Sequence, residues 1–316
     1  MRGLKKTLDK IKEAESIAIV CHINPDGDCI GSLLALGLGL EKLGKKVYFV
    51  SADGVPKRYR FLGGASKIAR KIKGEVDLAI SVDSNTKEML GSAFKIFKQA
   101  KSTIEIDHHQ VREPFADIEL IDAEASAVGE QIFLLLGKLK IEIGHDIAQN
   151  ILTSLIVETN SFRLPNVRPY TFKVCEELVK TGVDFYSIAN NVFWVSTKEK
   201  TVLSGLCLSR CKFLKKDKIV WSIIRRKDFE KTRGKDEDVD AVADEMRAIR
   251  DVKIAVLFRE KPNNKLRISL RSKDNINVAG VAQLYNGGGH LDVAGCSVDN
   301  RPGIIKELLG HLQKLV

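Results

Sequence analysis

The sequence lacks any run of apolar residues close to the roughly 20 that a helix needs to span a bilayer. Its first six residues, Met-Arg-Gly-Leu-Lys-Lys, lead into a charged amphipathic stretch and not into an apolar signal core. No internal repeat and no low-complexity linker interrupts the chain. From these absences we expect a cytoplasmic protein that has no membrane partner.

Cysteine and aromatic residues are also few. The six cysteines form no C-x-x-C pair, and Cys207 and Cys211 lie four residues apart, on one helical face. A thiolate zinc site would need more partners nearby, so we interpret the cysteines as small buried residues in a reducing compartment. Aromatic residues make up 6% of the chain, which leaves few stacking platforms for a long single-stranded nucleic acid.

What the chain does contain is typical of a globular protein. Its 316 residues are enough for two domains of ordinary size, and 44% of them are hydrophobic and 29% charged. The formal net charge of +10 favours an anionic substrate or partner, although charge alone does not specify a fold.

Short apolar runs that alternate with helix-like segments dominate the first part of the sequence. This alternation predicts α/β structure, with a parallel sheet that helices cover on both faces. Ligands of such sheets bind at the carboxyl ends of the strands. The predicted strands span residues 16–21, 46–50, 76–82 and 102–106, and helices are expected at 5–15, 31–43, 125–139, 147–159 and 170–181.

The pattern changes after about residue 195. We expect a metal-binding catalytic domain over residues 1–195, a connecting helix or linker over 196–212, and a smaller α/β substrate-binding domain over 213–316, with a cleft between the two domains. The second domain is predicted to contain strands at 218–224, 253–259 and 265–271 and helices at 239–249 and 302–315.

Four clusters of metal-binding residue types follow apolar segments. Nitrogen and carboxylate ligands of this kind suit divalent cations such as Mn²⁺ or Mg²⁺. Because three of the clusters come directly after predicted strands, we expect them to meet at one edge of the sheet. The clusters are His22-x-x-x-Asp26-x-Asp28, Asp83, Asp107-His108-His109, and Glu158 near the end of a predicted helix.

Individual positions leave alternatives open. Asp83 also fits the N-cap of a helix, a common role for aspartate. Asp107 is placed to orient a ligand histidine through its second ring nitrogen. A carboxylate that bridges two cations holds them roughly 3.5–4 Å apart, and such a pair activates a water molecule for attack on phosphorus.

These motifs resemble those of the DHH phosphoesterases, whose name matches the triplet Asp107-His108-His109. The segment Gly287-Gly288-Gly289-His290 resembles the Gly-Gly-Gly-His motif of the DHH-associated C-terminal domain, and Ser269 to Ser272 matches the strand that precedes it. The resemblance covers nearly the whole chain. It is nearest to the nano-RNase and pAp phosphatase type, which also includes cyclic di-AMP phosphodiesterases.

The resemblance implies a role for each matching residue. Two divalent cations are implied, with Mn²⁺ expected and Mg²⁺ or Co²⁺ as alternatives, and a homodimer is implied as well. His109, together with Asp83 and Asp107, is implied in catalysis. One metal would be held by His22, Asp26 and Asp83, the other by Asp28, Asp83, His108 and Glu158, and the substrate phosphate by Arg271, Gly287, Gly288, Gly289 and His290.

One position departs from the family pattern. Where the family has Asp-Thr-Gly-x-Phe, this chain has Glu158-Thr159-Asn160-Ser161-Phe162. Glutamate reaches roughly 1.5 Å further than aspartate and still ligates a metal, but the second metal is expected to shift or to bind more weakly. Asn160 replaces a glycine, and we expect it at positive φ, which asparagine tolerates.

The leading hypothesis is hydrolysis of short RNA or DNA oligonucleotides (nano-RNA), or of small nucleotides such as pAp, pApA or cyclic di-AMP, by water activated between two metals. A manganese pyrophosphatase shares the first domain, but the Gly-Gly-Gly-His segment argues against it. The absence of a further DNA-binding module argues against a single-strand exonuclease. A nucleotide-binding protein whose catalysis is impaired at Glu158 is the alternative that is not an enzyme.

Overall fold

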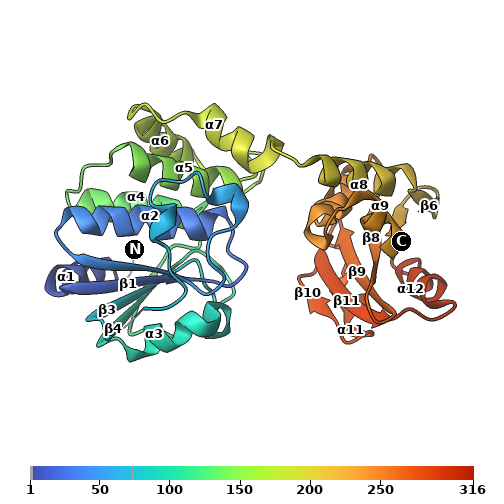
Figure 1. Cartoon of the computed structure of the whole chain (residues 1–316), viewed down its shortest axis with the longest axis horizontal. Coiled ribbons are helices and arrows are strands. Elements are labelled where there is room, and N and C mark those ends of the chain that lie inside the picture. Colours follow the sequence, from blue (N-terminus) through green and yellow to red (C-terminus); the bar gives the residue numbers. More distant parts are fainter. Residues whose placement is uncertain (1–2, 73) are drawn as a thin grey trace. The chain divides into compact units, whose positions relative to one another are not determined.

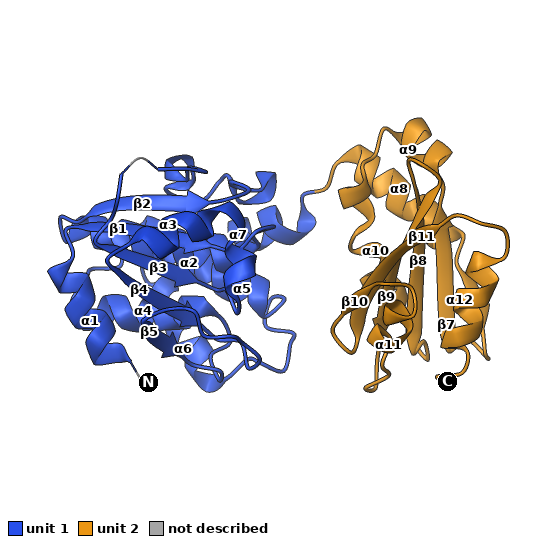
Figure 2. Cartoon of the chain, turned by 90° about the horizontal axis from the view of Figure 1, so that it is seen from below, with its two compact units in different colours: residues 1–195 blue, residues 196–316 orange. Residues whose placement is uncertain are grey.

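The computed structural model describes residues 3–72 and 74–316, and the chain divides into two compact units. Unit 1 comprises Met1–Val195 and unit 2 comprises Ser196–Val316 (Figure 1 and Figure 2). Each unit is a mixed α/β fold built around one sheet. The expected α/β class, with a parallel sheet in the N-terminal part, is confirmed.

The sheet of unit 1 has five strands in the order β2-β1-β3-β4-β5, and every neighbouring pair is parallel. Four of these strands coincide with the predicted apolar runs. The fifth, β5, escaped prediction because it has only four residues, of which Leu120 alone is fully buried. The strands are β1 (Ser16–Cys21), β2 (Lys46–Ser51), β3 (Leu78–Val82), β4 (Ser102–Asp107) and β5 (Ile118–Ile121).

Helices cover both faces of this sheet, as Figure 1 shows. On one face Ile17 and Ile19 of β1 join the main core beneath α2, α4 and α5, while on the other face Val20 packs with Phe97 of α3. Each fully buried side chain of this kind contributes roughly 1.5–3 kcal/mol. The helices are α1 (Leu4–Glu13), α2 (Gly27–Lys42), α3 (Phe94–Gln99), α4 (Val128–Lys138), α5 (His145–Glu158), α6 (Pro169–Val179) and α7 (Phe185–Ala189).

Four short helices complete unit 1. They connect the longer elements, and two of them, η1 and η4, pack against each other. Three are single-turn or 3₁₀ segments, whereas η4 is a π-helix. Their bounds are η1 (Lys57–Tyr59), η2 (Ala65–Lys67), η3 (Lys87–Ala93) and η4 (Asn190–Trp194).

Unit 2 is built on a six-stranded sheet of order β10-β11-β9-β8-β7-β6, in which only the pair β7 and β8 is parallel. One core forms with α11 and α12, and a second core forms on the opposite face with α8 and α10. The strands are β6 (Lys212–Leu214), β7 (Ile219–Ile224), β8 (Ile254–Lys261), β9 (Lys265–Ser272), β10 (Gly288–Gly289) and β11 (Val293–Asp299).

The helices of unit 2 include the segment that was expected to connect the two domains. This helix, α8, packs against α9, η5 and β7 within unit 2. Across residues 3–72 and 74–316, no helix combines the length and the apolar character that a membrane crossing requires. The helices are α8 (Lys198–Ser209), α9 (Arg226–Thr232), η5 (Asp236–Val239), α10 (Val242–Ala248), α11 (Ala279–Gln283) and α12 (Ile304–Leu312).

Candidate metal centre

The sheet of unit 1 aligns the ends of three neighbouring strands. In the register, Cys21 of β1 pairs with Val82 of β3, which in turn pairs with Ile106 of β4. Because the strands are parallel, the residues that follow these positions emerge at one edge of the sheet. This edge carries His22 after β1, Asp83 after β3, and the Asp107-His108-His109 triplet at the end of β4.

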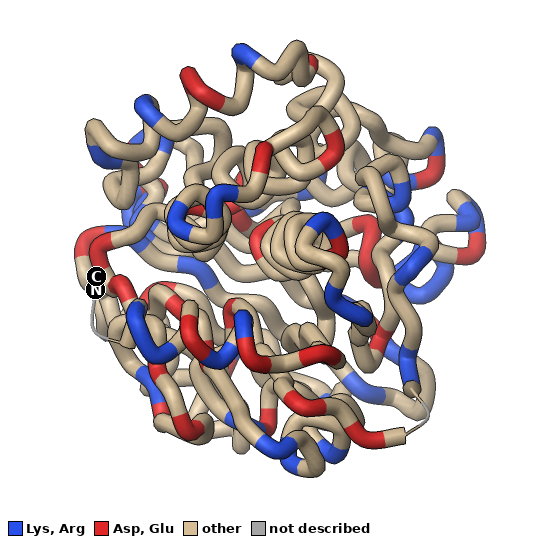
Figure 3. Tube along the Cα trace, turned by 90° about the vertical axis from the view of Figure 1, so that its left-hand side faces the viewer, with Lys and Arg blue, Asp and Glu red and all other residues tan. Residues whose placement is uncertain are grey.

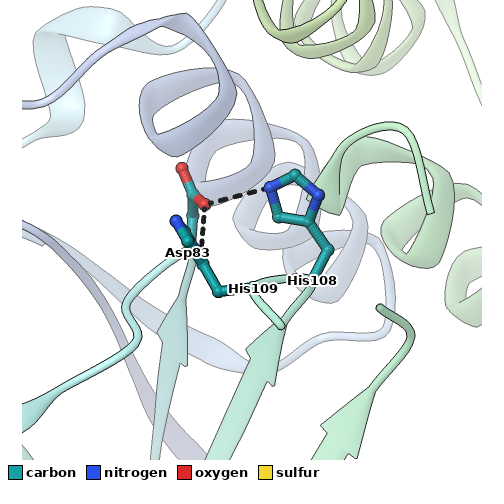
Figure 4. Close-up of side chains that lie close together, drawn as sticks. All are labelled: Asp83, His108 and His109. Carbon is teal, nitrogen blue, oxygen red and sulfur yellow. Dashed lines mark ion pairs between the residues drawn. The ribbon is translucent and has the colours of Figure 1, made fainter. Parts of the chain in front are cut away.

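Asp83 lies at the middle of the assembled side chains. Its carboxylate oxygens lie 3.6 Å from Nε2 of His22, 3.7 Å from Nε2 of His108 and 3.9 Å from Nδ1 of His109. Figure 4 shows the last two of these contacts. Asp83 has a left-handed backbone, with φ of 55°, and its amide donates to the Ile106 carbonyl at 3.0 Å. Asp83 is not a helix N-cap, because the helix that follows is capped at Thr86.

The start of α2 supplies Asp26. This residue is the N-cap of the helix, since its side chain accepts a hydrogen bond from the Cys29 amide at 3.0 Å. Its Oδ1 atom also lies 3.9 Å from Nε2 of His22. Asp26 therefore fixes the helix end and faces the histidine that follows β1.

Asp28, in the first turn of α2, is fully buried. Its carboxylate accepts hydrogen bonds from the Val128 amide at 2.9 Å, from Ser154 Oγ at 2.6 Å and from Ser32 Oγ at 3.0 Å. The Oδ2 atom lies 3.7 Å from Nε2 of His108. Since these donors come from α2, α4 and α5, three helices together hold this carboxylate in place.

Main-chain carbonyls orient two of the histidines. Nδ1 of His22 lies 2.7 Å from the Ile23 carbonyl, and Nδ1 of His108 lies 3.1 Å from the Ala125 carbonyl. A carbonyl only accepts, so Nδ1 carries a proton and Nε2 is the ring nitrogen that faces the carboxylates. This is the usual way in which a protein selects the tautomer of a metal-binding imidazole.

The carboxylate of Asp107 orients His109 and not His108. The Oδ1 atom of Asp107 lies 2.7 Å from Nδ1 of His109. The main-chain carbonyl of Asp107 accepts a hydrogen bond from Nε2 of Gln131 at 2.8 Å. The hydrogen bond from Asp107 raises the pKa of His109 to about 9, against the opposing effect of burial. The sequence-based interpretation of Asp107 as a residue that orients a histidine thus applies to the second histidine of the triplet.

The structure gathers every predicted metal ligand into overlapping groups. Within each group, donor atoms from all members lie within 4.8 Å of one another. Asp83 is shared by two groups and His108 by two, so that the three groups form one cluster. The groups are His22, Asp26 and Asp83; Asp28, His108 and Glu158; and Asp83, His108 and His109.

The electrostatics of the cluster fit divalent cations. Burial raises the pKa of Glu158 to about 8, with further contributions from the charges of Asp28 and Asp83. Burial lowers the pKa of His22, but the hydrogen bond and charge of Asp83 outweigh it and raise the value to about 10. Carboxylates that repel one another at a buried position, mixed with imidazoles, form a donor set that suits divalent cations.

Glu158 is the last residue of α5, and an unusual turn follows it. Asn160, Ser161 and Phe162 all have left-handed backbones, with φ of 47°, 56° and 62°. The Ser161 amide closes the turn by donating to the Ile156 carbonyl at 2.7 Å. The expectation of positive φ at Asn160 is confirmed. Ser161 and Phe162 share the left-handed conformation, which is strained for residues that carry a side chain.

Asn166 is a structural residue of the centre that the sequence did not reveal. Its Nδ2 group donates to the Ser126 carbonyl at 3.0 Å and to the Glu158 carbonyl at 3.2 Å. One side chain therefore ties the segment whose Ala125 carbonyl orients His108 to the helix end that carries Glu158. A lone asparagine in a loop gives no sequence signal for such a role.

Replacing Asn166 by alanine is expected to weaken binding of the metal that His108 and Glu158 are predicted to hold. Loss of a partner that orients metal ligands typically costs 10- to 100-fold in affinity, and we expect a loss within this range. Calorimetric titration of the metal-free protein with Mn²⁺ measures it. Asn191→Ala is the matched control, because Asn191 donates to Ser187 within α7. Equal affinities for the two variants would contradict the role of Asn166.

In unit 2 the predicted phosphate-binding residues lie on β9 and at or beside β10, two strands that are separated by β11 in the sheet. Arg271 of β9 pairs with Val293 of β11, and its Nε donates to Asp244 Oδ1 at 2.9 Å. The Gly-Gly-Gly-His segment forms β10 and a tight hairpin, in which the His290 amide donates to the Val293 carbonyl at 2.8 Å. The His290 side chain is exposed, and the Gly287 amide donates to the Ala282 carbonyl at 2.9 Å.

Two neighbouring glycines of this hairpin are expected to differ sharply in their tolerance of alanine. Gly289 has φ of +141°, and a Cβ atom there would lie 2.3 Å from the Val293 carbonyl oxygen, whereas a Cβ at Gly288 would meet nothing within 4 Å. Gly289→Ala should therefore cost about 1–3 kcal/mol of stability and Gly288→Ala much less. Denaturant unfolding of both variants tests this, and equal midpoints would refute it.

Comparison with known proteins agrees with this architecture. Residues 16–157 match the model of the DHH family, N-terminal domain, and residues 217–316 match that of the DHHA1 domain. An uncharacterized protein of Mycoplasma genitalium, MG371, is 30% identical over 313 residues, which cover 96% of this chain and 93% of that protein.

Two further relatives are informative. The bifunctional oligoribonuclease and PAP phosphatase NrnA of Thermus thermophilus is 26% identical over 285 residues, or 89% of this chain and 84% of its own length. The crystal structure of an exopolyphosphatase-related protein from Bacteroides fragilis superposes with a TM-score of 0.89 at 23% identity, over 99% of this chain and 95% of that one. With both domain models in their family order and the DHH triplet at the sheet edge, this chain belongs to the DHH family.

Proposed function

We propose that this DHH-family phosphoesterase hydrolyses short oligonucleotides or small nucleotides such as pAp, pApA or cyclic di-AMP, and that two divalent cations, preferably Mn²⁺, serve as its cofactors. The observation that carries the proposal is the position of Asp83, whose Oδ2 atom lies near His22 and whose Oδ1 atom lies near His108. A carboxylate placed in this way is suited to bridge two cations.

Each cation would have its own set of ligands. We assign His22, Asp26 and Asp83 to one, and Asp28, Asp83, His108 and Glu158 to the other. When bound, the metal pair supplies an activated water nucleophile and neutralises charge at the phosphate. Glu158, the one glutamate among these ligands, is the last residue of α5.

The remaining residues act on the substrate. Asp107 holds Nδ1 of His109, which directs Nε2 of this half-exposed ring away from Asp107 and makes it available to a phosphate oxygen or a leaving group. In unit 2 we assign Arg271, His290 and the glycines 287–289 to binding of the substrate phosphate. A guanidinium and closely approaching backbone amides are common anion ligands.

The substrate class is proposed on the chain's charge and its relatives. A net charge of +10 favours a polyanionic substrate, and a relative that covers most of the chain is named as an oligoribonuclease and PAP phosphatase. We also propose that the protein works in the cytoplasm as a homodimer. Pyrophosphate hydrolysis, single-strand exonuclease activity and nucleotide binding without turnover are the competing functions.

The decisive experiment compares substrates in the presence of Mn²⁺. Dinucleotides, a five-mer and a 24-mer of RNA, pAp, cyclic di-AMP and pyrophosphate are each incubated with purified protein, and the products are separated. Turnover of the short oligonucleotides or nucleotides alone is the expected result. Turnover confined to pyrophosphate, or rapid degradation of the 24-mer, would replace the proposal with one of the competing enzymes.

The variant Glu158→Asp separates an impaired site from a working one. No gain in turnover would mean that glutamate serves this centre. A large gain, starting from a wild-type protein that binds nucleotide without turning it over, would favour the nucleotide-binding protein.

A further inference from the structure

Aromatic residues are scarce in this chain, yet two of them stand exposed at the end of unit 1. The π-helix η4 buries Val192 and presents Phe193, with 39% of its surface exposed, and Trp194, with 77% exposed. A tryptophan costs free energy when its ring stays in water, because most of its surface is apolar. The pair therefore forms a site at which a flat apolar group can stack.

A basic segment packs against the helix that carries this aromatic pair. Helix η1 packs on η4, and Lys57, Arg58 and the adjoining Arg60 are all exposed. Among the described residues, none of these three cations forms a salt bridge. Figure 3 shows Lys and Arg interspersed with Asp and Glu along the backbone. The surrounding sequence, residues 54–74, contains seven Lys or Arg and no Asp or Glu.

The η1–η4 surface is also connected to the metal centre. Tyr59, the last residue of η1, is buried, and its ring lies 3.1 Å from where a Cβ on Gly27 would stand. Gly27 directly follows Asp26, one of the proposed ligands. A chain of packed residues thus runs from the cations of η1 to the metal-binding start of α2.

We propose that the η1–η4 surface binds the portion of a single-stranded oligonucleotide that extends beyond the scissile phosphate, an inference that rests on the proposed function. Lys57, Arg58 and Arg60 contact backbone phosphates, and a base stacks on Trp194. A groove of cations beside exposed aromatic rings is the general chemistry of single-strand binding. An apolar protein surface at this place would strip water from three cations that form no salt bridge among the described residues, which is costly.

The proposal predicts a preference that depends on substrate length. Removing an aromatic ring on which one base stacks typically lowers the affinity for the nucleic acid roughly 5- to 150-fold. Trp194→Ala should therefore lower kcat/KM for a five-mer by a factor in this range, relative to the same variant's value for a dinucleotide. Trp194→Phe, which keeps an aromatic face, should restore much of the difference.

Fluorescence provides a readout that does not depend on turnover. The chain has two tryptophans, so Trp221→Phe leaves Trp194 as the only one. Penta-adenylate, added to this variant in EDTA, should quench the emission, whereas an abasic pentamer and inorganic phosphate should not. Adding Lys57→Gln and Arg58→Gln should weaken the binding and flatten its salt dependence, while the control pair Lys95→Gln and Lys98→Gln, on α3, should change neither.

The outcomes separate this inference from the proposed function. Quenching by penta-adenylate without hydrolysis of any substrate would retain the surface and refute the function. Hydrolysis of dinucleotides by the wild type without any quenching would refute the surface alone. Emission that varies with protein concentration and not with RNA would show that a second copy of the chain covers Trp194, and would also overturn the inference.

Discussion

Asp83→Asn is expected to abolish Mn²⁺-dependent hydrolysis and to remove both metals together. Asparagine preserves the shape of the side chain but removes its charge and one of the two oxygens that face His22 and His108. Loss of an outer partner alone costs up to about 100-fold in metal affinity, and loss of a shared ligand should exceed that. Calorimetric titration should show that the variant takes up neither cation at concentrations that saturate the wild type.

The same strand provides the control. Asp77 lies just before the start of β3, whereas Asp83 lies just after its end, and Asp77 pairs with Lys101 at 2.7 Å. Asp77→Asn should retain activity and metal stoichiometry at 25 °C. A thermal scan provides a second readout, because a ligand whose free concentration is about 100 times its Kd stabilises a fold by about 2.7 kcal/mol. Stabilisation of Asp83→Asn by Mn²⁺ to the wild-type extent would disprove the bridging role.

Glu158→Gln is expected to make the metal-free protein more stable while it weakens metal binding and activity. The carboxylate of Glu158 is buried beside Asp28 and Asp83, and this raises its pKa to about 8 from its ordinary value of 4.5. An acid with a raised pKa binds a proton on folding, so its contribution to stability falls as the pH rises from about 4.5 through 8. Glutamine cannot ionise, and its amide donates to the neighbouring carboxylates.

The free energy of unfolding of Glu158→Gln should therefore exceed that of the wild type by an amount that grows with pH. The difference should level off above pH 8, at roughly 1–3 kcal/mol. Denaturant unfolding in EDTA between pH 5 and 9 measures it, while Mn²⁺ titration follows the opposite change in metal affinity. Glu124→Gln, at an exposed position, is the control and should show no such trend. A variant that is less stable than the wild type at pH 9 would show that Glu158 is not crowded by like charges.

Much of the candidate centre was predictable because its side chains come at or directly after the carboxyl ends of strands. The apolar runs that end at Cys21, Val82 and Ile106 mark β1, β3 and β4, and parallel neighbours bring the next residues to a common edge. The resemblance of the Asp107-His108-His109 triplet and of the Gly-Gly-Gly-His segment to family motifs added the expected ligand set, whose roles remain predictions.

What could not be predicted depends on contacts that single positions do not reveal. The partner of His108 is the main-chain carbonyl of Ala125, and the carbonyl of Glu158 is tied by Asn166. In unit 2, the helix α9 begins at Arg226 within a run of three basic residues, 225–227, and packs on β8. Periodicity cannot identify such elements, because they are short and stabilised by tertiary contacts.

The orientation of His22 and His108 by main-chain carbonyls has an evolutionary consequence. Every amino acid provides a carbonyl, so substitutions at Ile23, a partly exposed position, leave the hydrogen bond to His22 intact. The geometry of these two imidazoles is thus protected against drift at the residues that fix it. Covariation between sequences would miss these partners, and a library of variants at residue 23 should retain metal binding even where its side chains differ widely.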